Sequence, residues 1–186
     1  MNLFRVLCRV FFFVGISIFS QSFRLVKSQS TSCYEISNGQ RFLRPSSAVD
    51  PNRNYWRFAE LTLNGTVETP WKLLPTLNSC FRLCNPETGL YLMVAENDFT
   101  YAVARDLMQQ QPREAFIFGP YYPQWPNSLD ALITSTLKLH QLCVFLDDDP
   151  NEDKLIVTYP QQTASAHPTQ CRWQLRTVAC PRSDLC

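Results

Sequence analysis

Histidines, basic clusters and nucleotide-binding motifs are scarce or missing in this sequence, which excludes several classes of function. Only two histidines, His140 and His167, occur among 186 residues. There is no phosphate-binding glycine loop, zinc-binding helix motif or nucleophile elbow. The 17 basic and 16 acidic residues nearly balance, and no basic stripe interrupts that balance. We therefore predict no catalytic site, no cofactor and no binding to nucleic acid.

A long apolar run is present only at the start of the chain. Arg5 and Arg9 precede "VFFFVGISIFS", which a polar stretch follows. This layout is typical of a secretory signal, and the run is shorter than the roughly 20 residues of a membrane span. We predict a signal peptide over residues 1–28, cut between residues 20 and 30, and a secreted chain without a membrane span. The alternative is an uncleaved anchor helix.

Cysteine is the residue type that the chain has in excess. One of the eight cysteines, Cys8, lies in the predicted signal peptide. Behind a signal peptide, cysteine at this density is typical of disulfides. Zinc is the alternative, but zinc sites use closely spaced pairs, and only Cys80 and Cys84 are close together. Seven mature cysteines are an odd number, so at least one of them must lie outside any disulfide within the chain.

Three stretches of the sequence share one pattern. They are "YEISNGQRFLRP" from Tyr34, "FRLCNPETGLYLMV" from Phe81 and "LKLHQLCVFLDDD" from Leu137. Each opens with the alternation of a half-buried strand and continues, after a polar break, into a second apolar strand. A third strand-like run starts 17 to 21 residues after each opening residue. The three copies predict an internal repeat, which cannot bury its apolar face alone.

An aromatic triplet closes each copy, 35 to 37 residues after its start: "WKL" at Trp71, "FIF" at Phe116 and "WQL" at Trp173. Three repeats of four strands resemble the β-trefoil superfamily, over residues 33–180. The resemblance implies an all-β domain in which first and fourth strands form a barrel and the middle hairpins form a cap. Trp71, Phe116 and Trp173 would be its core anchors, and residues 181–186 a tail. The alternative is an all-β sandwich.

The branch of the superfamily stays open between ricin-B-like lectins and cytokine-like proteins. The lectin branch carries Gln-any-Trp in its fourth strands, whereas two residues separate Gln170 from Trp173, and Phe116 stands in the second copy. The basic surface that is common in the growth-factor branch is missing. The amino-terminal signature of the plant-type protease inhibitors is missing as well.

The trefoil resemblance also implies a disulfide pattern. A trefoil closes its barrel between its first and last strands, which Cys33 and Cys180 flank. Cys143 and Cys171 are expected to meet where barrel and cap join. With an extended "FRL" between them, Cys80 and Cys84 would have Cα atoms about 13 Å apart, too far for a disulfide. That leaves Cys80 to pair with Cys186, and Cys84 as the odd thiol, which would be available to link two chains.

Candidate ligand-binding residues lie in "GPYYPQWPNS". Its prolines exclude a central strand, and Tyr121, Tyr122 and Trp125 are good contact residues for sugars or proteins. The alternative is that they fold back to cover the barrel. A second candidate, "DDDPNED" from residue 147 to 153, spaces carboxylates at alternate positions but lacks the glycine and glutamate of a calcium loop, so we predict no metal site. Asn64 heads a glycosylation sequon.

These features together predict a secreted, non-enzymatic protein that recognises an extracellular glycan or protein through its loops. Carbohydrate is the first expectation. The alternatives are a structural or interaction protein of an extracellular matrix, and a protease inhibitor or cytokine-like ligand.

Overall fold

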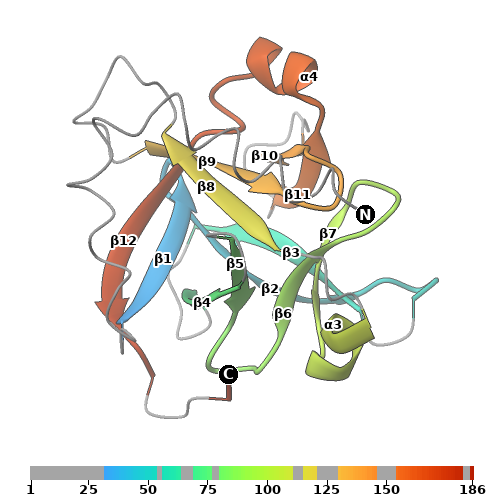
Figure 1. The fold of residues 1–186 in the computed structure, drawn as a ribbon, viewed down its shortest axis with the longest axis vertical. Coiled ribbons are helices and arrows are strands. Elements are labelled where there is room, and N and C mark those ends of the chain that lie inside the picture. Colours follow the sequence, from blue (N-terminus) through green and yellow to red (C-terminus); the bar gives the residue numbers. More distant parts are fainter. Residues whose placement is uncertain are drawn as a thin grey trace.

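The computed structural model describes residues 32–53, 56–63, 69–76, 80–110, 115–120, 130–145, 154–181 and 185–186 (Figure 1). Within these stretches the strands, in chain order, are β1 (Ser32–Asn38), β2 (Arg41–Val49), β3 (Arg57–Thr62), β4 (Pro70–Pro75), β5 (Phe81–Cys84), β6 (Tyr91–Val94), β7 (Thr100–Val103), β8 (Phe116–Pro120), β9 (Asp130–Ser135), β10 (Gln141–Val144), β11 (Lys154–Tyr159) and β12 (Trp173–Ala179). Two short helices, α3 (Arg105–Gln110) and α4 (Gln161–Ala166), accompany them. Neither helix has the length and apolar character that crossing a membrane requires.

Six of these strands close into a barrel. β1 pairs with β4, β4 with β5 and β5 with β8. β8 then pairs with β9, β9 with β12, and β12 with β1, so the ring of antiparallel strands is complete. These are the first and fourth strands of the three repeats. The predicted β-trefoil architecture is therefore confirmed.

The other six strands form the cap of the barrel. They are arranged as three hairpins, β2–β3, β6–β7 and β10–β11. β3 pairs with both β7 and β11, and Phe99 bridges to Val157, which joins the hairpins to one another. Each barrel strand thus has one end connected to the cap. Its other end, where β4 meets β5, β8 meets β9 and β12 meets β1, lies away from the cap.

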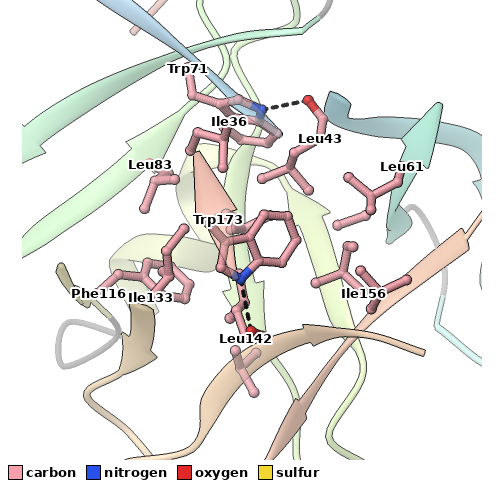
Figure 2. Close-up of a cluster of buried hydrophobic side chains, with 14 residues drawn as sticks. Ile36, Leu43, Leu61, Trp71, Leu83, Phe116, Ile133, Leu142, Ile156 and Trp173 are labelled. Carbon is pink, nitrogen blue, oxygen red and sulfur yellow. Dashed lines mark hydrogen bonds between the residues drawn. The ribbon is translucent and has the colours of Figure 1, made fainter. Parts of the chain in front are cut away.

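The three predicted core anchors are confirmed, since Trp71, Phe116 and Trp173 are fully buried. The indole N–H of Trp71 donates to the carbonyl oxygen of Leu43 in β2, at 2.9 Å. The indole N–H of Trp173 makes the same contact in the third repeat, with Leu142 in β10, at 2.8 Å (Figure 2). The core therefore satisfies the polar atoms of both tryptophans while it buries their rings.

The predicted start of the third repeat is wrong. Its expected first strand, "LKL", lies in the turn between β9 and β10, where Leu137 and Leu139 are both 44% exposed. Leu139 has a φ of +60°, the left-handed conformation that Gly89 adopts in the corresponding turn of the second repeat. Leucine rarely adopts this conformation, so its side chain gave no signal of a turn. The first strand of the repeat is β9, which begins seven residues earlier.

Two disulfides are those that the trefoil resemblance implies. Cys33 is bonded to Cys180, which joins the ends of β1 and β12 and so fastens the barrel where its first and last strands meet. Cys143 is bonded to Cys171, which ties β10 to the segment before β12. The first bond closes the barrel, and the second ties a cap strand of the third repeat to the segment before the fourth strand of that repeat.

The expected bond between Cys80 and Cys186 is wrong. Cys186 is bonded to Cys84, and Cys80 is buried outside the three disulfides. The reason lies in the end of the chain, where the N–H of Leu185 donates to the carbonyl oxygen of Pro86 at 3.1 Å. This contact brings the end of the predicted tail to the turn after β5, as Figure 1 shows, and Cys84 is the cysteine that Cys186 meets there. Cys84 is therefore not available to link two chains.

Candidate functional site

The predicted binding residues, Tyr121, Tyr122 and Trp125, lie outside the described residues, but both ends of their segment are placed. Residues 121–129 connect β8 to β9, whose ladder runs from Phe116 opposite Ser135 to Pro120 opposite Ala131. This continuous hairpin fixes the two points at which the segment leaves and rejoins the barrel. Both points lie at the end of the barrel away from the cap.

Three polar side chains lie where residues 121–129 rejoin the barrel. Asp130 opens β9, and its Oδ1 accepts a hydrogen bond from Nε2 of Gln174 at 3.1 Å. Its Oδ2 lies 3.1 Å from Nε of Arg172, whose side chain is 48% exposed. We call Asp130, Arg172 and Gln174 the Asp130 cluster. Its carboxylate and guanidinium compensate each other in charge, while the guanidinium and the amide are exposed to solvent.

The local sequence explains why the cluster faces outward. Successive side chains of a strand point to opposite faces, so the burial of Trp173 turns Arg172 and Gln174 to the outer face of the barrel. Asn38 fixes the approach to this strand, because its Nδ2 donates to the carbonyl oxygens of Thr169 (2.8 Å) and Arg172 (2.7 Å). The cluster was not predicted from the sequence, although the polar–aromatic–polar order "RWQ" indicates that Arg172 and Gln174 share one face of the strand.

A second polar group lies in the cap, where the first repeat meets the second. The hydroxyl of Tyr101 donates to Oδ2 of Asp50 at 2.8 Å. The backbone N–H of Asn52 and this hydroxyl hold the pKa of Asp50 below its ordinary value, while burial raises the pKa of Tyr101 above its own. Arg53 lies over the ring of Trp56, 4.6 Å from its centroid. These side chains contact one another, and the bond between Tyr101 and Asp50 links the second repeat to the first.

A third polar group joins the second repeat to the third around Asp98. Its Oδ1 contacts Nζ of Lys138 (2.8 Å), Nδ1 of His140 (3.2 Å) and Oγ1 of Thr158 (3.0 Å). Burial raises the pKa of Asp98, but hydrogen bonds from Lys138 and Thr158 outweigh burial, so this pKa lies below its ordinary value. The threonine hydroxyl donates to the carboxylate rather than to the imidazole. The group therefore lacks the nucleophile–base contact of covalent catalysis.

The described residues form no site for a metal ion. Within the stretches that the structure covers, no group of three or more His, Cys, Asp and Glu side chains is placed to hold a metal ion. The acidic stretch from residue 147 to 153, the sequon at Asn64 and the predicted signal peptide all lie outside these stretches.

Comparisons with known proteins identify the fold and leave the family open. No protein-family model and no curated protein matches this chain. The designed threefold-symmetric protein ThreeFoil is similar in structure, at 11% identity and a TM-score of 0.59 over 78% of this chain and 98% of that one. So is a proteinase inhibitor from Coprinopsis cinerea, at 13% identity and a TM-score of 0.56 over 78% and 97% of the two chains.

A lectin from Polyporus squamosus, solved with a sialylated influenza-binding epitope, is also similar. Its identity is 14% and its TM-score 0.55, over 77% of this chain and 48% of the lectin chain. At these identities the likenesses show the fold alone. Together with the closed barrel and the three joined hairpins, they show that the chain has the β-trefoil fold.

Proposed function

We propose that this chain is a secreted, non-enzymatic protein that binds an extracellular carbohydrate through residues 121–129. The observation that carries this proposal is the β8–β9 hairpin, which holds both ends of an aromatic, proline-rich segment away from the cap. Binding residues are commonly placed on loops that a rigid scaffold positions. The tyrosines and the tryptophan of this segment offer flat apolar faces with polar tips, which suit the faces and hydroxyl groups of a sugar ring.

Secretion is part of the same proposal. The apolar run at the start of the chain and the three disulfides both suit export into an oxidising compartment. We expect the mature chain to begin between Gln21 and Thr31 and to carry a glycan at Asn64. Mass spectrometry of the protein collected from the medium of expressing cells tests both points. A protein that keeps its amino terminus and stays in the membrane fraction would refute the export proposal.

The carbohydrate proposal is tested on a glycan array with the mature chain. We expect Trp125→Ala, and Tyr121→Ala combined with Tyr122→Ala, to abolish the binding that the unaltered chain shows. Phe145→Ala is the matched control, because Phe145 is an exposed aromatic residue after β10, at 41% exposure, and we expect it to bind as the unaltered chain does. Inhibition of a proteinase without any glycan binding would instead favour the inhibitor alternative.

A further inference from the structure

A polar contact recurs where the first strand of a repeat ends and meets the neighbouring repeat. Asn38, the last residue of β1, donates from Nδ2 to the carbonyl oxygen of Arg172 at 2.7 Å. Asn85, which follows β5, donates in the same way to the carbonyl oxygen of Pro70 at 3.1 Å. Both acceptors stand directly before a core tryptophan of the neighbouring repeat. The amide of each asparagine therefore holds one repeat to the next.

The third repeat makes the corresponding contact without an asparagine. The backbone N–H of Thr136 donates to the carbonyl oxygen of Ala115 at 2.9 Å, and the N–H of Ala115 donates to Oγ1 of Thr136 at 3.0 Å. Ala115 precedes Phe116, so this contact also stands directly before a core anchor. Of the three joints between repeats, the first two thus depend on a side-chain amide and the third does not.

The residue that follows an asparagine determines how easily its amide is lost. In deamidation the backbone nitrogen of the next residue attacks Cγ, a C–N bond forms and ammonia leaves. Water then opens the succinimide to aspartate or isoaspartate. Glycine favours the attack because it has no Cβ, whereas proline excludes it because its nitrogen carries no hydrogen. Asn38 is followed by Gly39, and Asn85 is followed by Pro86.

The surroundings of Asn38 leave its neighbour open but restrain its amide. Gly39 is the first residue of the two-residue turn between β1 and β2, it is exposed, and the position of a Cβ there has no neighbour within 4 Å. The amide of Asn38 has three acceptors. Besides Arg172, these are the carbonyl oxygens of Thr169 at 2.8 Å and Gln170 at 3.4 Å. Because these contacts restrain the amide, we expect the folded chain to react slowly.

We propose that Asn38–Gly39 is a deamidation site that the fold restrains, and that its product cannot remake the joint between the first and third repeats. A carboxylate in place of the amide has no hydrogen to donate, and it would face carbonyl oxygens that are themselves acceptors. These carbonyls belong to residues 169–172, which lead into β12 and include Cys171, the disulfide partner of Cys143. Deamidation therefore loosens this segment irreversibly in each molecule whose joint has opened.

The site is tested by incubating the mature chain at mildly alkaline pH, with its disulfides intact, in buffer and in urea. Peptide mapping by mass spectrometry follows both asparagines. We expect Asn38 to convert about tenfold or more slowly in buffer than in urea, because hydrogen bonds of its amide must break first. Asn85 is the internal control and should stay an amide in both. Equal rates for Asn38 in buffer and urea, or no conversion in urea, would overturn the proposal.

Two variants separate the chemistry from its consequence. Gly39→Ala should slow the conversion of Asn38 in urea, because the added Cβ hinders the attack. Asn38→Asp reproduces one product, and Asn38→Ala is its matched control, since it removes the donor without adding a charge. We expect Asn38→Asp, and the deamidated chain separated by its extra charge, to unfold at lower temperature than both the unaltered chain and Asn38→Ala. A deamidated chain as stable as the unaltered chain would overturn the proposed consequence.

Discussion

Replacing Trp173 is the strongest test of the core. Its side chain is fully buried, and its indole N–H donates to the carbonyl oxygen of Leu142. A buried tryptophan replaced by alanine costs about 3–5 kcal/mol, and a buried carbonyl that loses its donor adds about 1–3 kcal/mol. Domains of this size unfold at about 5–15 kcal/mol. We therefore expect Trp173→Ala to lose a large part of the free energy of unfolding.

Trp173→Phe divides this cost into its two parts. Phenylalanine already stands at the equivalent position of the second repeat, as Phe116, so the barrel accepts its ring. We expect this variant to lose about 1–3 kcal/mol, chiefly the hydrogen bond to Leu142. Urea unfolding under non-reducing conditions measures both variants, with the exposed change Phe145→Leu as a control. A loss below about 1 kcal/mol for Trp173→Ala, or equal losses for the two variants, would refute the assignment of Trp173 as an anchor.

Three further predictions concern the disulfides, the cap and a turn. Cys84→Ser removes a bond between residues 102 positions apart, so we expect the free energy of unfolding to fall by up to about 4–5 kcal/mol in the chain-entropy model. Non-reducing peptide mapping of this variant should no longer show the carboxy-terminal peptide joined to β5. An unchanged map would contradict the pairing. Tyr101→Phe removes a hydrogen-bond donor from Asp50, whose folded pKa lies below its ordinary value, so this variant should be less stable than the unaltered chain at pH 7. The difference in stability should shrink as the pH falls through the folded pKa of Asp50. A difference that grows on acidification would refute this reasoning. Gly89→Ala should lower the unfolding temperature more than Gly39→Ala does. Both glycines have a positive φ, but only a Cβ at position 89 would lie 3.2 Å from the Leu185 side chain. Equal losses would mean that the contact with Leu185 is unimportant.

The repeat pattern could be predicted because each repeat contributes the same kinds of strand to the barrel, so the same order of apolar and polar residues recurs in the sequence. Alternating strands and an aromatic residue at the start of each fourth strand are needed in every repeat, so Trp71, Phe116 and Trp173 marked the three copies. The pairing of Cys33 with Cys180 followed from the same closure. These features depend on periodicity and topology, which a single sequence carries.

The features that were missed depend on particular contacts between distant residues. Leu139 adopts a left-handed turn without the glycine that marks such turns, so the start of the third repeat was placed too late. The choice of Cys84 over Cys80 depends on the contact between Leu185 and Pro86, which sequence spacing does not encode. The partners within the Asp130 cluster are more than 40 residues apart in sequence, and only the β9–β12 pairing brings them together.

Carbohydrate binding by residues 121–129, at the end of the barrel away from the cap, is the proposal that most needs a direct test. The most direct measurement is a nuclear magnetic resonance titration of the ¹⁵N-labelled mature chain with the tightest ligand from the glycan array. We expect amide shift changes concentrated in residues 119–132 and in the paired residues 172–175. Shift changes concentrated instead in the cap, at residues 50–58 and 95–101, or an array on which no glycan binds, would contradict the claim.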